Sequence, residues 1–495
     1  MRVSVIISYS NIYLVPTDAF FMSQMSSLRV AAARHAKDMA GKAVGISGWI
    51  RTIRKQGKIT FIEVNDGSCL RNMQVVADFD VHNQQNRLAL GASVRIEGTL
   101  VKGPKSHGEM ELQIADHKCF QVLGSCDPAA YPLQKKYHSV EFLRDMLHLR
   151  PRSNLSGAML RVRSQLSHAI REFLHEQKFL EINTPVLTSN DCEGAGEMFE
   201  IFQKNKDNGN QYDFFNNPTY LTVSGQLHAE IFASSMSKVY TFGPTFRAEN
   251  SNTSRHLAEF WMLEPEIAFA DISDAMALAE GCLKSSVKHV LSNCDEDLDF
   301  FNKRVDQNVL VRLAKTLEEP FHSISYSDAI DILRKDSEKN DKPNFEYSDI
   351  FWGMNLQSEH EKYLSEVVFD GRPTFIHHYP AEIKPFYMKQ SMEDDGKTVE
   401  AFDLVVPKIG ELVGGSARED NYEKLYEAMV SHNIIDTDNE MNSNELEWYL
   451  DLRKYGSVPH AGFGMGFERL LQFVTGISNI RDAIPIPRSK GTCMM

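Results

Sequence analysis

The chain has 495 residues, of which 42% are apolar, so it is long enough for two or three domains with a substantial core. It contains no apolar run of membrane-spanning length, which excludes a membrane protein. Its seven cysteines form neither a Cys-x-x-Cys pair nor a cluster at zinc spacing. The net charge of −14 argues against a surface covered by nonspecific nucleic-acid contacts, but it is compatible with a local RNA site.

Residues 1–40 are poor in acidic residues and contain several arginines and serines, a composition typical of an organelle transit peptide. A frayed terminus or an upstream start codon would explain the same composition. Residues 1–40 are therefore predicted to be a leader that precedes the first domain.

Residues 41–125 are predicted to form a small β-barrel. Five short strands in one segment suit an oligonucleotide-binding (OB) barrel. Several arginines and lysines precede Phe61, which could stack on an unpaired base, although a basic strand end is more often a solvated edge. The β-like stretches, separated by turn residues, are residues 44–50, 58–64, 73–79, 92–101 and 110–123.

Residues 126–152 contain three prolines and are predicted to be a hinge to a second domain, residues 153–495. Apolar residues recur every three to four positions from Val162 to Phe173, which predicts an amphipathic helix. Strand-like stretches alternate with helical ones, so the second domain is expected to be α+β. Further helical patterns occur at residues 271–292 and 422–432, and a helical insertion is expected near 270–345.

The segment around Arg247 combines two apolar strands with a polar loop. Arg247 could bind a phosphate in bidentate fashion, and Arg255 and His256 could hold the far end of a polyphosphate. Glu249 could accept a hydrogen bond from an exocyclic amine, and Phe260 could stack on a base. A charged hairpin with cross-strand ion pairs is the alternative interpretation.

Gly462, Gly464 and Gly466 alternate along a predicted strand that leads into a helix containing Arg469. A bare strand face would let a flat nucleotide base or the backbone of a ligand approach closely. The spacing does not match the Gly-x-Gly-x-x-Gly dinucleotide fingerprint. By itself, this glycine pattern does not indicate one function. It becomes a specific signal only in combination with the Arg247 segment.

Asp403 and Glu411 bracket a predicted turn at residues 407–410. If a hairpin brings the two carboxylates together, they could bind Mg²⁺, and phosphate oxygens would complete its octahedral coordination. Solvated carboxylates beside a turn are the alternative interpretation.

At these clusters the chain resembles class II aminoacyl-tRNA synthetases. Residues 179–185 are similar to motif 1, residues 246–266 to motif 2 and residues 462–469 to motif 3, in the family's order. A barrel placed before the catalytic domain resembles the aspartate, asparagine and lysine branch. The resemblance implies an α+β protein with a five-stranded OB-fold barrel and a class II catalytic domain, whose antiparallel sheet is flanked by helices.

The resemblance also implies that an amino acid is activated with ATP and Mg²⁺ and transferred to tRNA. Arg247, Arg469 and His256 would be catalytic, and Asp403 and Glu411 would hold the metal. A homodimer through motif 1 around Pro185 is implied. Arg54, Phe61 and Gln74 would bind the anticodon, with Phe61 on its middle base. The implied ATP-binding residues are Arg247, Glu249, Arg255, His256, Leu257, Phe260, Glu411, Gly464, Gly466 and Arg469.

Within the branch, the chain resembles the asparaginyl enzymes. Ala229 replaces a lysine of the aspartyl enzymes, and an unpaired substrate carboxylate would be costly in that pocket. Glu264 would accept a hydrogen bond from the side-chain NH₂ of asparagine while Arg418 donates to its amide oxygen, which disfavours aspartate. The other implied amino-acid-binding residues are Ser224 and Arg247, with Glu193 and Gln226 at the α-amino group.

The implied partners are therefore L-asparagine and tRNA(Asn), but other hypotheses were compared. An aspartyl-tRNA synthetase with relaxed tRNA choice is disfavoured by Ala229 and Glu264. A non-aminoacylating RNA-binding paralogue commonly loses a motif arginine, whereas this chain has both. An ammonia-dependent asparagine synthetase would lack the barrel. The tail at residues 487–495 is similar to mitochondrial forms and, with the leader, predicts the mitochondrial matrix, with the cytoplasm as the alternative.

Overall fold

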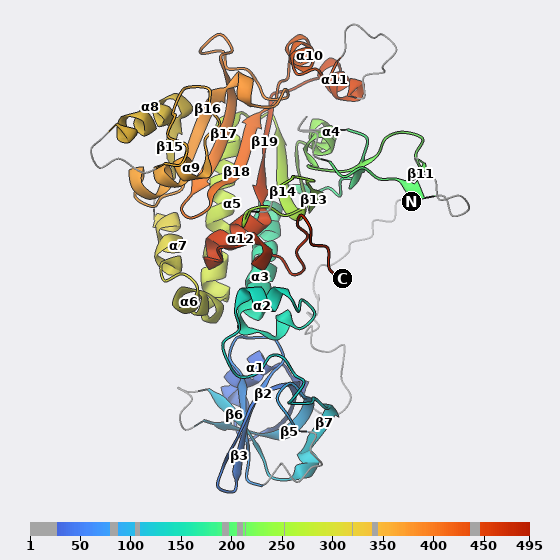
Figure 1. Cartoon of the computed structure of the whole chain (residues 1–495), viewed down its shortest axis with the longest axis vertical. Coiled ribbons are helices and arrows are strands. Elements are labelled where there is room, and N and C mark those ends of the chain that lie inside the picture. The colour runs from blue at the N-terminus through green and yellow to red at the C-terminus, as the bar shows by residue number, and fades with distance from the viewer. Residues whose placement is uncertain are drawn as a thin grey trace, which may run out of the picture. The chain divides into compact units, whose positions relative to one another are not determined.

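The chain divides into two compact units, residues 1–139 and 140–495 (Figure 1), and the division falls within the predicted hinge. Among the described residues, no helix is both long enough and apolar enough to cross a membrane. The computed structural model describes residues 27–79, 88–103, 109–190, 198–204, 211–212, 214–251, 253–318, 320–338, 345–435 and 446–495.

The first unit contains a closed five-stranded barrel, as predicted. Its strands close in the order β2-β3-β4-β6-β5, and β5 pairs back onto β2. The last predicted stretch forms two strands, because Asp116 caps a 3-10 turn (His117–Cys119) that separates β6 from β7 (Phe120–Gly124). The barrel strands are β2 (Ala43–Gln56), β3 (Ile59–Asn65), β4 (Met73–Ala77), β5 (Ser93–Lys102) and β6 (Met110–Ile114).

Residues 27–40, which composition assigned to the leader, belong to the barrel unit instead. β1 (Ser27–Leu28) pairs in parallel with β2, and α1 (Val30–His35) buries Val30 in the barrel core. Arg34 on the same helix is 1% exposed and forms a 2.6 Å ion pair with Glu109. An acid-poor composition does not distinguish this buried helix from a leader. Residues 1–26 lie outside the described residues.

The second unit is built on an eight-stranded sheet (Figure 1). All neighbouring strands are antiparallel except the pairs β15–β16 and β13–β8 at the two edges, so the sheet is mixed only there. In spatial order the strands are β15 (His322–Ser325), β16 (Thr374–Pro380), β17 (Thr398–Val406), β18 (Gly410–Ala417), β19 (His460–Gly466), β14 (Glu259–Ala268), β13 (Lys238–Phe246) and β8 (Leu180–Glu181).

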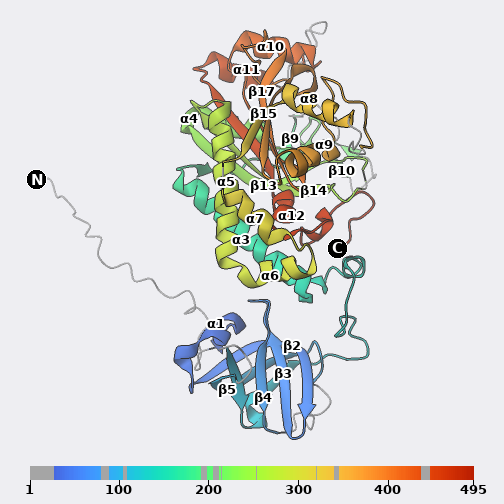
Figure 2. The same cartoon turned by 90° about the vertical axis from the view of Figure 1, so that its left-hand side faces the viewer.

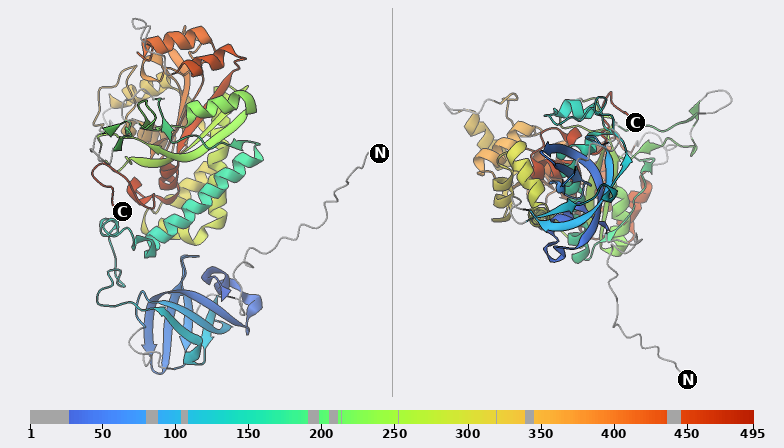
Figure 3. Two further views of the ribbon diagram at one scale, coloured as in Figure 1. Left: turned by 90° about the vertical axis from the view of Figure 1, so that its right-hand side faces the viewer. Right: turned by 90° about the horizontal axis from the view of Figure 1, so that it is seen from below.

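Two long helices lie against this sheet. α5 (Ile272–Asn293) packs across β17, β18 and β19, and α3 (Asn154–Glu176) lies along α5 (Figures 2 and 3). α3 begins at the capping side chain of Ser153 and buries Val162, as its spacing predicted. α5 begins at Asp271, which forms a capping box and so satisfies N–H groups of the first turn.

The region near 270–345 is largely helical, as expected, but it also contributes β15 to the sheet. Two small strand pairs lie outside the main sheet, β9 (Leu187–Thr188) with β12 (Tyr220–Leu221) and β10 (Gln203–Lys204) with β11 (Gln211–Tyr212). The other α-helices are α2 (Val140–Arg144), α4 (Gln226–Met236), α6 (Asp295–Arg304), α7 (Val309–Glu318), α8 (Tyr326–Ser337), α9 (Ser358–Tyr363), α10 (Tyr422–Ser431), α11 (Glu447–Lys454) and α12 (Phe467–Thr475).

Candidate active site

Arg247 follows directly after β13, where the chain enters the loop that returns as β14. Its backbone N–H donates to the carbonyl of Ala258 at 3.1 Å, and its guanidinium lies 5.4 Å from the centre of the Phe260 ring. His256 in the loop lies 3.2 Å from Glu249 and 2.6 Å from the hydroxyl of Thr253. The predicted arrangement of two strands around a polar loop is confirmed.

The first turn of α12 connects this region to the hairpin formed by β17 and β18. Arg469 donates to the backbone carbonyl of Glu411 at 2.9 Å and to its carboxylate at 3.2 Å. Arg255 donates to the carbonyl of Ile409 in the hairpin turn at 3.1 Å. Because β18, β19 and β14 are neighbours in the sheet, three clusters far apart in the sequence meet at one place.

All ten residues expected to bind ATP line a single pocket with about 640 Å³ of space. The pocket is also lined by Met262, Leu412, Glu468 and Ile480, which the sequence did not indicate. The ten expected residues are Arg247, Glu249, Arg255, His256, Leu257, Phe260, Glu411, Gly464, Gly466 and Arg469.

Two of the alternating glycines of β19, Gly462 and Gly464, lie against side chains of the neighbouring strand β14. Gly462 lies opposite Glu266, and a Cβ at Gly462 would collide with the Glu266 carboxylate. A Cβ at Gly464 would lie 2.6 Å from the methyl group of Met262. Gly464 and Gly466 line the pocket, but Gly462 does not. Protein side chains therefore fill the space over both Gly462 and Gly464, so the expected bare strand face is occupied at these two positions.

The expected metal ligands come together across the β17–β18 hairpin. A Cβ at Gly414 would lie 3.1 Å from a Glu411 carboxylate oxygen and 3.4 Å from one of Asp403, so both carboxylates lie over this glycine. Burial raises the pKa of Asp403; Lys384, at 3.0 Å, opposes that shift and Glu411 adds to it. The charge of Glu411 thus opposes ionisation of Asp403, and two adjacent carboxylates of this kind are a donor set suited to a divalent cation.

Within the described parts of the chain, no group of three or more metal-binding side chains converges. The pair Asp403 and Glu411 would therefore hold Mg²⁺ only with oxygens from phosphate or water completing the coordination, which is usual for this ion.

A third carboxylate, Glu361 on α9, was not expected from the sequence. It is 9% exposed, and it accepts a hydrogen bond from the backbone N–H of Glu411 at 2.9 Å. Gly410, with a φ of +86°, leaves space for it, because a Cβ there would collide with Glu361. Burial, and then the charge of Glu411, raise the pKa of Glu361 to about 7. A glutamate in a short polar helix gives no sequence signal of burial.

The two residues expected to select the amino acid, Glu264 and Arg418, each form hydrogen bonds with other groups of the protein. Glu264 accepts hydrogen bonds from the hydroxyl of Ser224 and, at 2.9 Å, from the backbone N–H of Gly225. Arg418 is 2% exposed and donates to both carboxylate oxygens of Glu266, at 2.6 and 3.2 Å. Burial disfavours the charged form of Arg418, but the carboxylate of Glu266 favours it more strongly, so the pKa of Arg418 is raised. The role of Glu266 as the partner of Arg418 was not expected from the sequence. Glu266 lies two residues beyond Glu264 and is therefore on the same face of β14.

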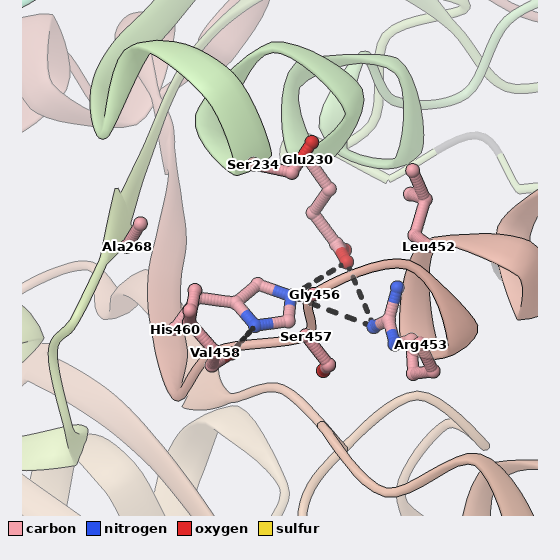
Figure 4. A pocket seen from close by; sticks show the side chains of 9 residues that line it. All are labelled: Glu230, Ser234, Ala268, Leu452, Arg453, Gly456, Ser457, Val458 and His460. Atoms are coloured by element: carbon pink, nitrogen blue, oxygen red, sulfur yellow. Dashed lines mark hydrogen bonds and ion pairs between the residues drawn. The ribbon is translucent and has the colours of Figure 1, made fainter.

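Gln226, expected at the α-amino group, begins α4 and donates to Glu230 at 3.1 Å. Glu230 also pairs with Arg453 and His460, each at 3.0 Å (Figure 4), and accepts a 2.7 Å hydrogen bond from Tyr449. Burial opposes ionisation of Glu230, but Arg453 and His460 outweigh it and lower its pKa. This buried network joins α4 to α11 and β19 and so fixes the first turn of α4.

Ala229, the position at which a lysine would indicate an aspartyl enzyme, is fully buried against Ala233 and Val239. α4 therefore supplies no cation from this position. Glu193 lies outside the described residues.

The residues expected to bind an anticodon lie on three neighbouring strands of the barrel. Arg54 on β2 is opposite Phe61 on β3, and its guanidinium lies 5.2 Å from the centre of the ring. Gln74 on β4 is opposite Glu63 and donates to Glu111 on β6 at 2.9 Å. Phe61 and Glu63 share a strand face, so Phe61 and Gln74 lie on the same side of the barrel wall.

Residues 139–490 match the family model described as tRNA synthetases class II (D, K and N), and residues 44–118 match the OB-fold nucleic acid binding domain. The asparagine–tRNA ligase of Desulfotalea psychrophila is 50% identical over 453 residues, which cover 91% of this chain and 96% of that protein. The chain belongs to the asparaginyl-tRNA synthetases. Family membership confirms the predicted aminoacyl-tRNA ligase activity and the OB-fold plus class II architecture.

Further asparaginyl-tRNA synthetases are similar over nearly the whole chain. The chloroplastic/mitochondrial asparagine–tRNA ligase of Arabidopsis thaliana is 47% identical over 489 residues, which cover 93% of this chain and 83% of that protein. The crystal structure of the Pyrococcus horikoshii enzyme complexed with asparaginyl-adenylate has a TM-score of 0.81 at 32% identity, and the match covers 95% of this chain and 100% of that one.

The raised pKa of Glu361 predicts a pH-dependent contribution to stability. A carboxyl with a pKa of about 7 in the folded chain and 4.5 when unfolded favours folding at low pH, and this advantage is lost as the pH rises through 7. Relative to Glu361→Gln, the free energy of unfolding of the wild type should fall by about 3 kcal/mol between pH 4.5 and 8 without metal. Hydrogen exchange of β18 amides in EDTA measures this difference.

Glu366→Gln is the matched control, because Glu366 lies five residues further along and is exposed. Because Glu366→Gln keeps Glu361, it should retain the fall of about 3 kcal/mol that Glu361 causes between pH 4.5 and 8. A difference between the wild type and Glu361→Gln that does not change with pH would contradict the raised pKa.

Proposed function

We propose that the pocket formed by the Arg247 loop, β19 and the β17–β18 hairpin is the site at which L-asparagine is activated with ATP, and that tRNA(Asn) is the acceptor. The convergence of all ten expected ATP-binding residues on one pocket carries this proposal. Membership of the asparaginyl-tRNA synthetases supports the choice of amino acid and of tRNA.

In the proposed reaction, the carboxylate of asparagine attacks the α-phosphate of ATP, and the bond to the β-phosphate breaks to release pyrophosphate. A ribose hydroxyl at the 3′ end of the tRNA then attacks the mixed anhydride and releases AMP. No protein nucleophile is needed, so catalysis depends on positioning and on the stabilisation of charge. Arg247 would bridge the substrate carboxylate and the α-phosphate, while Arg469 and His256 would hold the β- and γ-phosphates.

The base of ATP would lie against Phe260, whose ring also contacts the Arg247 guanidinium, and Glu249 would accept a hydrogen bond from the exocyclic amine of the base. Mg²⁺ on Asp403 and Glu411 would supply positive charge to the phosphate oxygens. Lys384 and Arg469, each already bound to one of these carboxylates, favour their charged forms and so prepare the pair for a cation.

Selection of asparagine would depend on two fixed polar groups of opposite character. Glu264 would accept from the amide NH₂, and Arg418 would donate to the amide oxygen. Both side chains are already oriented by hydrogen bonds, which reduces the cost of ordering them when the substrate binds. An aspartate side chain would instead place a carboxylate against Glu264, and no lysine at Ala229 would compensate. Ser224, Gln226 and Glu193 would complete the amino-acid site.

We further propose a homodimer formed through motif 1 around Pro185. β8 is an edge strand of the sheet, and Leu180 on it is 51% exposed. Met236 at the end of α4 and Phe269 directly after β14 are 55% and 73% exposed. An apolar sheet edge of this kind is suited to burial against a second copy of the chain. Sedimentation equilibrium would distinguish a dimer from a monomer.

A mitochondrial location is also proposed, with the cytoplasm as the alternative. The acid-poor composition before Ser27 and the similarity to a relative named chloroplastic/mitochondrial support it. Because residues 27–40 belong to the barrel unit, a removable leader would have to end before Ser27. Imaging of the full chain carrying a C-terminal fluorescent tag tests this location.

The amino-acid preference is tested by ATP–pyrophosphate exchange with asparagine or aspartate at equal concentrations. The wild type should exchange with asparagine, and Glu264→Gln should lower kcat/KM for asparagine about 100-fold, because a charged hydrogen-bond acceptor is lost. Glu259→Gln on the same strand does not alter the pocket lining and should stay within about twofold of wild type. Exchange with aspartate would indicate an aspartyl enzyme, and none with either would indicate a paralogue without this activity.

The anticodon contact is tested by Phe61→Ala. Loss of one base-stacking surface should raise the KM for tRNA(Asn) about tenfold. ATP–pyrophosphate exchange should be unchanged, because it does not involve tRNA. Leu123→Ala, which removes another exposed apolar side chain of the barrel unit, is the control and should leave both values unchanged. An unaltered KM for tRNA in Phe61→Ala would refute the stacking role.

A further inference from the structure

A second cavity adjoins the ATP pocket. It has about 1600 Å³ of space including its open mouth, and it shares Arg255, His256, Glu411 and Arg469 with the ATP pocket. Its other walls come from α9, from the β17–β18 turn and from the end of α12. The shared residues include those proposed to hold the β- and γ-phosphates. The cavity therefore begins where the pyrophosphate part of bound ATP would end.

Beyond the shared residues, the cavity carries two lysines, Lys362 on α9 and Lys408 in the turn. Lys362 is half-buried, and burial, followed by the charges of Arg255 and Lys408, lowers its pKa, although the charges of Glu366 and Glu361 oppose this effect. Burial and the charge of Arg469 likewise lower the pKa of Arg255, although Glu361 opposes this effect. Four cationic side chains of the cavity lie close enough together to disfavour one another's charged forms. They are Lys362, Lys408, Arg255 and Arg469.

The carboxylates near these lysines are engaged elsewhere. Glu361 accepts from the backbone N–H of Glu411, and Glu366 accepts from the backbone N–H of Lys408 at 2.6 Å. Asp306, which also lines the cavity, forms a 2.7 Å ion pair with Arg312 and interacts electrostatically with Lys408.

Neither lysine ammonium group makes a hydrogen bond or ion pair within the described residues. Clustered cations whose ammonium groups form no direct ion pair are stabilised when an anion with several oxygens binds between them.

We propose that this cavity is the leaving site for pyrophosphate, with Lys362 and Lys408 as its binding residues. The inference rests on the proposed function of the ATP pocket. When the bond between the α-phosphorus and the bridging oxygen breaks, that oxygen and its electron pair leave with the β-phosphate, so the product carries more negative charge than the same group in ATP. Arg469 and Arg255 contact both cavities, and the two lysines supply the additional positive charge along the exit.

The test is ATP–pyrophosphate exchange with the pyrophosphate concentration varied, in the full chain carrying Lys362→Ala, Lys408→Ala or both. The double variant should raise the KM for pyrophosphate about tenfold, as expected for the loss of two charged contacts. The KM values for ATP, asparagine and tRNA in aminoacylation should stay within twofold. Inhibition of aminoacylation by added pyrophosphate should weaken by the same factor, and Lys362→Arg should restore most of the affinity.

Lys335→Ala, on the exposed face of α8 and outside the cavity, is the matched control and should change none of these values. An unchanged KM for pyrophosphate in the double variant would overturn the inference. A raised KM for tRNA instead would overturn it in favour of a nucleic-acid phosphate site. Absence of exchange in the wild type would overturn the proposed function itself and is thereby distinguished from both results.

Discussion

The catalytic unit depends on the way Glu411 is held at the end of the β17–β18 hairpin. Its carbonyl and carboxylate accept hydrogen bonds from Arg469, and its N–H donates to Glu361. A partly exposed ion pair contributes only about 0–1 kcal/mol, so these contacts do not by themselves hold the segments together. The antiparallel register of β18 and β19 does so, and the charged contacts then orient side chains that line the proposed ATP pocket.

A second set of charges is fully buried and has a different energetic role. Glu266 with Arg418, and Glu230 with Arg453 and His460, lie in the interior where an unpaired charge would cost several kcal/mol. Such pairs add little net stability, but removing one partner typically costs about 3–5 kcal/mol. These pairs restrict orientation, because the groups of the proposed amino-acid site cannot rearrange without breaking a buried pair. The bare backbone of Gly462 is part of the same arrangement, since it admits the Glu266 carboxylate.

Features whose signals are local could be predicted from the amino-acid sequence alone. Periodic apolar residues predicted α3, a helical pattern at residues 271–292 predicted α5, and five β-like stretches predicted the barrel. The clusters around Arg247, Asp403 and Gly464 were recognised because unusual residue types recur there at short spacing. Their combination also indicated the family, since three short motifs in a fixed order constrain one another.

Which charges are buried and which segments meet depends on long-range packing, and the local sequence did not predict it. Glu361 lies in a short polar stretch, and the sequence of such a stretch is the same whether the helix faces water or the hairpin. Glu266 is buried because β14 pairs with β19. The helix that begins at Val30 resembles a leader in composition but packs in the barrel core. In each case the deciding contact joins residues far apart in the chain, and local propensity contains no information about the register or packing that brings them together.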